Sequence, residues 1–247
     1  MTCQHILFGP DESQVPLSPE YGPETSSIPI LFQPIVDTFE HRLLAHECLL
    51  GVSGAQPSGA QTGRELEPAE AARVRSLAIH SAARQAPRGL YFLNLAASSI
   101  DDPALDMSST IEAVLNSGMK PGNFVFEMAE SDLAGNPAHS HRIREYLRKH
   151  GFGFALSRAG VGAGACSFQA ACDFAPEYIN LDRHLIRNFD QPVCAPAIGK
   201  LVQIAEKSGA RVVAQGVDRG RMLENLWLLG VRFMQGHLFG DPSRLIA

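Results

Sequence analysis

From Leu90 onward, short apolar segments alternate with helical ones, and this alternation constrains the fold more than any other feature. The apolar segments that we expect to be strands are 90–95, 124–128, 152–156, 178–181, 211–216 and 231–236. The helices expected between them are 106–117, 137–150, a short one after residue 160, 197–208 and 219–229. Parallel strands joined by helices form either a closed barrel or an open doubly wound sheet.

Two further strands, 30–37 and 42–50, precede a helix expected at 69–85. The link over residues 38–41 is too short for a parallel crossover, which needs about a dozen residues, so these two strands form an antiparallel hairpin. Gln33, near the start of the first strand, then lies at the same rim as Glu47, toward the end of the second.

Eight strands predict a (β/α)8 TIM-like barrel whose first strand is antiparallel. A doubly wound sheet is the alternative, but the Gly160–Gly164 segment, GVGAG, is neither GxGxxG nor a phosphate-binding loop. We expect the barrel to occupy residues 28–247. Residues 1–27, rich in Pro, Ser and Glu, are expected to form a tail or an extension.

Composition excludes several classes of function. The formal charge of −5 argues against a nucleic-acid partner, which would need a basic face. No apolar run is long enough for a membrane span. The five cysteines contain no CxxC pair, so we expect reduced thiols, a cytoplasmic location and no zinc site.

Polar residues stand late in nearly every expected strand. They are Glu47, Asn94, Glu127, Ser157, Arg158, Asn180, Asp182, Gln215 and Gln235, with Glu130 just beyond a strand. Each of them alone is an ordinary residue where a strand meets solvent. A barrel brings all of these strand ends to one rim, and carboxylates with amides at one rim are typical of metal-dependent hydrolases that bind an anionic substrate.

Eight segments carry a family resemblance in the right order. They are FQPIVD (32–37), HECLL (46–50), FLNLA (92–96), FVFEMAES (124–131), ALSRAGVG (155–162), YINLDRHLI (178–186), VVAQGVD (212–218) and FMQGHLFGDP (233–242). The chain resembles the EAL domain, the cyclic di-GMP phosphodiesterase domain of bacterial signalling. The resemblance implies an EAL-type barrel and a site for two Mg²⁺ or Mn²⁺ ions.

The resemblance also assigns residues to the site. It places Glu47, Asn94 and Glu127 at metal-ligand positions, where they are intact. Candidates for the ligand groove are Gln33, Leu49, Glu130, Arg158, Asp182 and Gln235.

The departures from the family pattern suggest lost catalysis. Ser157 and Arg158 replace two adjacent metal-binding aspartates, Asn180 replaces the lysine beside the attacking water, and Gln215 replaces a glutamate. A second divalent cation would lose both its bridging carboxylates and its charge balance. We therefore expect no intact catalytic set and no cofactor, with Mg²⁺ or Mn²⁺ only if residual metal binding or activity persists.

We interpret the chain as a degenerate EAL domain, catalytically inactive, that acts as a regulatory module. It would act through a protein partner, favoured here, or by binding cyclic di-GMP without hydrolysis. Gly51 replaces an arginine that meets a substrate phosphate, which argues against nucleotide binding, whereas Arg158 could restore that charge. The alternative is an active phosphodiesterase that cleaves cyclic di-GMP to linear pGpG. A homodimer is an expectation from the family.

Two side chains carry hypotheses of their own. Arg158 either occupies the vacated metal position and pairs with Glu127 or Glu47, or points into solvent. Trp227, with Leu223 and Leu226, is expected to be core on the barrel-facing side of its helix. An exposed tryptophan would instead indicate a partner surface.

Overall fold

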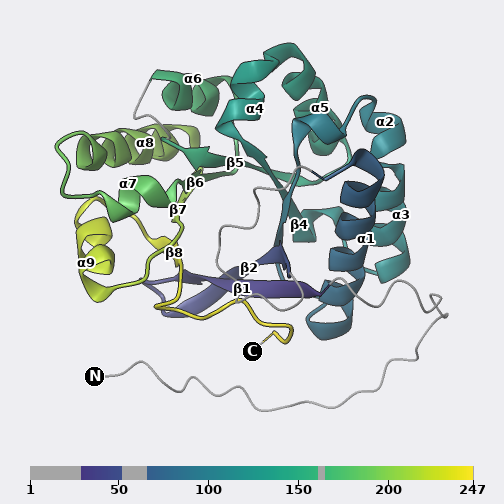
Figure 1. The fold of residues 1–247 in the computed structure, drawn as a ribbon, viewed down its shortest axis with the longest axis horizontal. Helices are drawn as coiled ribbons and strands as arrows, with labels where there is room; N and C mark the ends of the chain where they lie inside the picture. The colour runs from purple at the N-terminus through teal and green to yellow at the C-terminus, as the bar shows by residue number, and fades with distance from the viewer. Residues whose placement is uncertain (1–28, 52–65, 161–164, 247) are drawn as a thin grey trace.

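The structure, a computed structural model, describes residues 29–51, 66–160 and 165–246. Eight strands close into one barrel in sequence order, with helices packed around the outside (Figure 1). The closed barrel confirms the predicted fold class. The expected tail over residues 1–27 and its boundary lie outside the described residues.

The strands lie close to the ranges that the apolar runs predict. They are β1 (Ile30–Asp37), β2 (Arg42–Leu50), β3 (Tyr91–Asn94), β4 (Phe124–Ala129), β5 (Gly153–Ala159), β6 (Tyr178–Leu181), β7 (Arg211–Ala214) and β8 (Phe233–Gln235). β1 is antiparallel to both β2 and β8, and every other pair is parallel. Gln33 is the register partner of Glu47, which confirms that the hairpin brings both to one rim.

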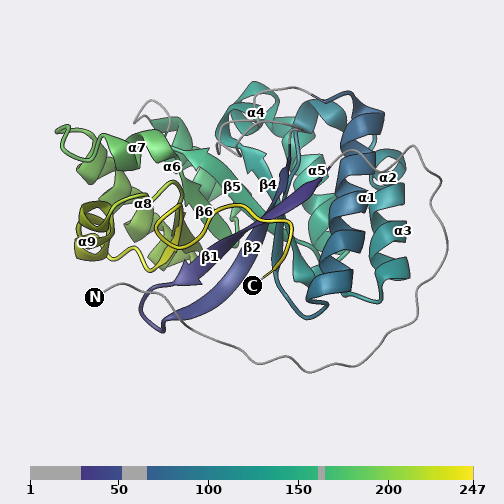
Figure 2. The same ribbon diagram turned by 60° about the horizontal axis from the view of Figure 1, so that its bottom comes forward.

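Helices follow the strands as the alternation requires. They are α1 (Pro68–Gln85), α2 (Pro103–Asp106), α3 (Ser108–Ser117), α4 (Glu130–Gly135), α5 (Pro137–Lys149), α6 (Ala165–Phe174), α7 (Arg183–Arg187), α8 (Cys194–Ser208) and α9 (Gly220–Leu228). Helices α1 and α3 pack together on one side of the barrel, and α8 and α9 lie on the opposite side (Figures 1 and 2).

The helix expected at 106–117 begins earlier and is interrupted. The Asp102 side chain caps a first short helix by accepting a hydrogen bond from the Ala104 amide, and Pro103 occupies its first position. A new helix then starts after Met107, which is fully buried. The short helices α4 and α7 were not predicted, because six and five residues are too few to show a helical period.

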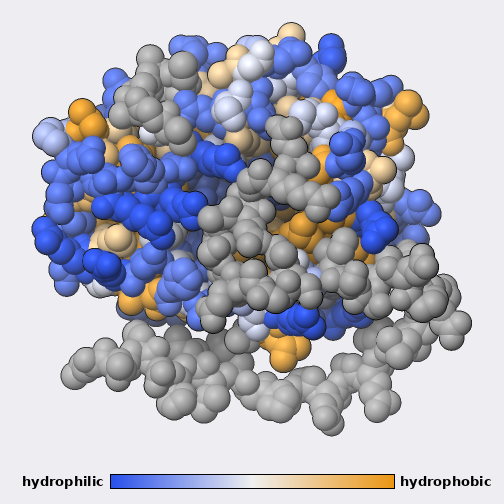
Figure 3. Space-filling model, in the orientation of Figure 1, coloured by the Kyte–Doolittle hydropathy of each residue, from blue (hydrophilic) through white to orange (hydrophobic). Residues whose placement is uncertain are grey.

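The core has two parts. Side chains that point into the barrel come from alternate strand positions and form one cluster: Ile35, Ala45, Phe92, Val125, Ala155, Tyr178 and Val213. The larger cluster fills the space between the strands and the helices. Hydrophilic residues cover most of the described surface seen in Figure 3, where hydrophobic residues form separate groups. Within the described ranges, no helix combines the length and apolar composition that a membrane span requires.

The prediction for Trp227 is wrong. Leu226 is the fully buried residue of α9, whereas the Trp227 side chain is 40% exposed. Successive residues of a helix point about 100° apart, so only one of these two neighbours can face the barrel. The indole nitrogen donates a hydrogen bond of 2.9 Å to Thr38 Oγ1, in the turn between β1 and β2.

Candidate functional site at the carboxyl rim

Glu47 and three other polar side chains, each from a different strand, form one cluster. Gln235 Nε2, from β8, donates a 2.7 Å hydrogen bond to Glu47 Oε2 and a 3.1 Å bond to Gln33 Oε1. Asn94 Nδ2, from β3, donates a 3.3 Å bond to the other Glu47 oxygen. Gln33 Nε2 in turn donates to the Gly240 carbonyl. The structure therefore brings together the predicted residues Gln33, Glu47, Asn94 and Gln235.

Glu127 is the second carboxylate of this rim. It is buried on β4, and its register partner on β3 is Asn94. Its Oε1 atom is buried and makes no hydrogen bond with any described residue. Asn180, on β6, faces it, yet neither polar atom of the Asn180 side chain forms a hydrogen bond of normal geometry with a described residue. Polar atoms that are buried and unpaired are rare in folded proteins and often mark a functional site.

The two carboxylates disturb one another. Burial raises the pKa of Glu47, and the amide hydrogen bonds from Gln235 and Asn94 partly oppose that rise. Burial also raises the pKa of Glu127 well above its usual range, the negative charge of Glu47 adds to the rise, and only neighbouring Asn180 opposes it. The pair therefore favours either a bound proton or a cation.

The next strand carries no acid at this rim. Ser157 is buried at the register position beside Ala129, and the exposed Arg158 follows it. Arg158 has φ of 53°, in the left-handed region, at an irregularity in the pairing of β5 with β6. Among the ion pairs of the described residues, none joins Arg158 to Glu47 or Glu127, so the predicted pairing in the vacated metal position is wrong. The backbone turn at the irregularity leaves this side chain at the surface.

Other predicted site residues take part in local structure. Glu130 is buried and accepts a 3.1 Å hydrogen bond from the Gly160 amide. Asp182 caps α7 by accepting a 2.7 Å bond from the His184 amide. Leu49 and Gln215 are half-buried.

Glu47, Asn94 and Glu127 are the residues that would hold a divalent cation here, and their two carboxylates are too few for two such ions. Glu47, Asn94 and Glu127 offer carboxylate and amide oxygens, the ligand type that Mg²⁺ and Mn²⁺ prefer. The neighbouring strand ends supply Ser157, Asn180 and Gln215, all neutral. Among the described residues, no group of three or more acid, histidine or cysteine side chains is placed to hold a metal.

Sequence reasoning missed a second polar cluster at the rim. Asp218 accepts hydrogen bonds from His237 Nδ1 at 2.9 Å and from the Arg187 guanidinium at 3.1 Å. These hydrogen bonds hold the pKa of Asp218 below its usual value despite its partial burial. Asp218, which follows β7 in VVAQGVD, could have indicated this cluster, because it lies at the same rim as Gln235.

Comparisons with known proteins show which family of domains contains this site. The family model described as "EAL domain" matches residues 23–242 of this chain. The cyclic di-GMP phosphodiesterase RocR of Pseudomonas aeruginosa is 31% identical over 138 residues, which cover 55% of this chain and 35% of that protein. The cyclic di-GMP phosphodiesterase PdeL of Escherichia coli is 27% identical over 134 residues, which cover 52% of this chain and 36% of that protein. The chain thus matches about a third of the length of these curated relatives.

Solved structures have the same fold. BlrP1 of Klebsiella pneumoniae, in complex with manganese and cyclic di-GMP, superposes with a TM-score of 0.80 at 22% identity, over 93% of this chain and 59% of that one. A standalone EAL protein of Vibrio cholerae, bound to cyclic di-GMP, gives a TM-score of 0.78 at 24% identity, over 90% of this chain and 94% of that one.

Proposed function

This chain belongs to the EAL domain family, and from that premise we propose that it is a catalytically inactive domain of cyclic di-GMP signalling. It acts as a regulatory module by binding a partner rather than by cleaving the nucleotide. The free thiols of Cys48, Cys172 and Cys194 agree with a reducing cytoplasmic location.

One observation carries the proposal. The ends of β5, β6 and β7 present Ser157, Asn180 and Gln215 at the positions where the family resemblance implies an aspartate, a lysine and a glutamate. Two metal ions act together to hold the attacking and the leaving oxygens of an in-line displacement. Glu47 and Glu127 can balance one divalent charge, whereas Ser157, Asn180 and Gln215 are neutral and supply no anionic ligand for the second half of such a site.

Charge at the rim favours a protein partner over a metal-free nucleotide. Glu47 and Glu127 are buried acids with raised pKa values, and among the described residues no arginine or lysine forms an ion pair with either. A phosphodiester brought to this point would meet negative charge or a protonated acid instead of a cation. Gly51, at the end of β2, offers no side chain to a phosphate.

A nucleotide receptor is the second candidate. One solved structure of similar fold is BlrP1 of Klebsiella pneumoniae with FMN and cyclic di-GMP and no metal ions, which gives a TM-score of 0.71 at 20% identity. That complex supports the idea that an EAL barrel holds the nucleotide without metal. In this chain the exposed Arg158 follows Ser157 at the altered end of β5 and would supply a cation there.

Calorimetric titration of cyclic di-GMP into the purified protein, with and without Mg²⁺, separates these candidates. We expect no heat at about 100 μM ligand, which corresponds to binding weaker than about −5.5 kcal/mol. Heat without Mg²⁺ and without linear product would make the domain a receptor. A variant that combines Ser157→Asp, Arg158→Asp, Asn180→Lys and Gln215→Glu is the positive control, and turnover by it alone would support loss of catalysis at these positions.

A further inference from the structure

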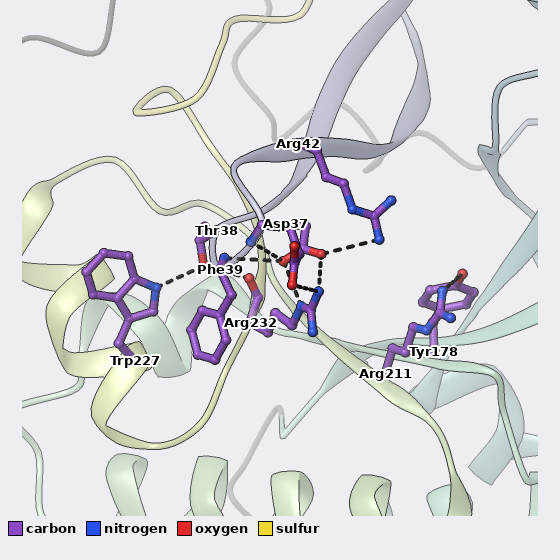
Figure 4. Close-up of polar contacts among 9 residues, drawn as sticks. Asp37, Thr38, Phe39, Arg42, Tyr178, Arg211, Trp227 and Arg232 are labelled. Atoms are coloured by element: carbon purple, nitrogen blue, oxygen red, sulfur yellow. Dashed lines mark hydrogen bonds and ion pairs between the residues drawn. The ribbon is translucent and has the colours of Figure 1, made fainter.

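The end of the barrel opposite the rim carries a second set of polar and aromatic side chains (Figure 4). It lies where β1 ends and where β2, β7 and β8 begin, since Asp37 is the register partner of both Arg42 and Phe233. We call this set the basal surface, which consists of Thr38, Phe39, Arg42, Arg211, Trp227 and Arg232. None of these residues belongs to the site at the rim.

A buried carboxylate organises the basal surface. Asp37 has no exposed side-chain area, and Arg232 binds it through two hydrogen bonds of 2.7 and 2.6 Å. These two hydrogen bonds from Arg232 are the main reason why the pKa of Asp37 is lowered. The acid therefore stays charged and neutralises Arg232. The Arg232 guanidinium also lies 5.9 Å from the Phe39 ring centre and 5.4 Å from that of Phe233, and 3.5 Å from the exposed Glu40.

Two further arginines, Arg42 and Arg211, add positive charge that the Asp37–Arg232 pair does not neutralise. Arg42 is 62% exposed and lies 3.6 Å from Asp37, which Arg232 already binds. Arg211 is exposed, donates a 3.2 Å hydrogen bond to the Tyr178 hydroxyl, and stacks at 5.8 Å on the rings of Tyr178 and Phe233. Among the described residues, no carboxylate forms an ion pair with Arg211. Counting Asp37 and Glu40 against these three arginines, the surface keeps a positive excess on a chain of net charge −5.

Exposed aromatic groups border these arginines. The Phe39 side chain is 52% exposed and that of Trp227 is 40% exposed. The indole of Trp227 is held in place, because Thr38 Oγ1 accepts its hydrogen bond and donates to the Arg232 carbonyl at 2.7 Å. The Phe39 ring packs against the Arg232 guanidinium. Arginine and aromatic side chains fixed before binding are the residue types enriched at the centres of protein interfaces.

We propose that the basal surface docks an acidic peptide segment of a partner protein. The carboxylates of that segment would pair with Arg42 and Arg211, and its apolar side chains would cover Phe39 and Trp227. This inference rests on the proposed function only for the premise that a protein partner exists. It places the contact at the end of the barrel away from Glu47 and Glu127.

Charge also argues against a second copy of this chain as the occupant. A two-fold interface centred here would bring the same surface from each copy together and oppose arginines with arginines. Like charges across an interface disfavour the pairing. A complementary negative segment removes that penalty and uses the stacked, pre-positioned guanidinium of Arg211.

The test uses the full chain and a defined probe, without nucleotide or metal. Trp227 is the only tryptophan of the chain, so its fluorescence reports directly on this surface. The probe is a peptide of about twelve residues that alternates Glu with Leu and Phe, and its control has Gln in place of Glu. We expect the acidic peptide to bind at least about tenfold more tightly than the neutral one, with the difference lost at high salt.

Variants assign the binding to the proposed residues. Arg42→Gln with Arg211→Gln should weaken the acidic peptide at least about tenfold, while Arg42→Lys with Arg211→Lys keeps part of the affinity. Arg148→Gln is the matched control, because Arg148 is a 64% exposed arginine on α5 that pairs with Glu145. It should leave the affinity unchanged.

Several results would overturn the proposal. They are equal binding of the two peptides, no binding of either, an equal loss in the Arg148 variant, or displacement of the peptide by inorganic phosphate of equal charge. A change of oligomeric state in the double Gln variant, seen by light scattering, would assign this surface to a second copy instead. None of these outcomes bears on hydrolysis at the rim, so failure here and failure of the proposed function are distinguishable.

Discussion

Gln235 donates a 2.7 Å hydrogen bond to Glu47 across β1, at the point where the last strand of the barrel closes against the first. The two residues are 188 positions apart, and the same amide nitrogen also contacts Gln33. The contact therefore satisfies a buried carboxylate and ties the seam of the barrel together.

Removing that amide should destabilise the fold. Gln235→Leu leaves one Glu47 oxygen buried without its donor, and we expect a loss of about 1–3 kcal/mol in the free energy of unfolding. Denaturation in urea measures it. Gln235→Glu is the informative comparison, because it places a second carboxylate against Glu47 and should cost more at pH 8 than at pH 5. An unchanged midpoint in both variants would contradict the role of this contact.

Glu127 should make the protein less stable as the pH rises. Its pKa is raised in the folded state, so its contribution is fully favourable below the unfolded value of about 4.3 and is lost as the pH rises toward the folded value. Glu127→Gln removes this dependence. We expect the stability of the variant relative to the natural chain to increase from pH 5 to pH 8, measured in urea with a chelator present. A constant difference across that range would refute the burial argument.

His46 should make the protein less stable as the pH falls, which is the opposite of the effect of Glu127. It is buried between Phe32 and Tyr91, and burial lowers its pKa to about 4. Its contribution to stability is therefore present above the unfolded value of about 6.5 and is lost as the pH falls toward about 4. NMR titration of the imidazole signals, assigned by their loss in His46→Phe, should give one midpoint near pH 4. A midpoint near 6.5 would mean that the ring is solvated.

The basal carboxylate should matter more to stability than the exposed arginine beside it. Asp37→Asn removes the charge that Arg232 binds through two hydrogen bonds, whereas Arg42→Gln removes an exposed partner at 3.6 Å. Thermal unfolding should therefore show a clearly larger decrease for Asp37→Asn. Because the pKa of Asp37 is lowered, its contribution is present above about 3.8 and is lost as the pH falls below that value, so the two variants should converge in strong acid.

Much of the fold follows from local patterns. Continuous apolar runs bounded by glycine or polar residues located all eight strands, and the four-residue link after Asp37 required the antiparallel hairpin. The placement of Gln33 and Glu47 at one rim followed from that hairpin. These features depend on neighbouring residues, which is why they could be predicted from sequence.

The errors concern contacts between distant parts of the chain. The sequence placed Gln235 and Glu47 at one rim but did not indicate the hydrogen bond between them, because only closure of the barrel brings β8 beside β1. Trp227 was assigned to the core by its apolar helix, but its indole N–H bonds to Thr38 in a turn 189 positions away. The left-handed backbone at Arg158, which directs its side chain to the surface, has no signal in a residue type that rarely adopts it.

The central claim is that the rim no longer supports hydrolysis, and a single-turnover assay tests it most directly. The protein is placed in excess over cyclic di-GMP with Mg²⁺ or Mn²⁺, and linear product is followed by chromatography. The phosphodiesterase RocR of Pseudomonas aeruginosa is the positive control. We predict no product above the protein-free background, because Ser157, Asn180 and Gln215 cannot assemble a second metal site. Formation of linear product that Glu47→Gln abolishes would contradict the account and show that one metal site suffices.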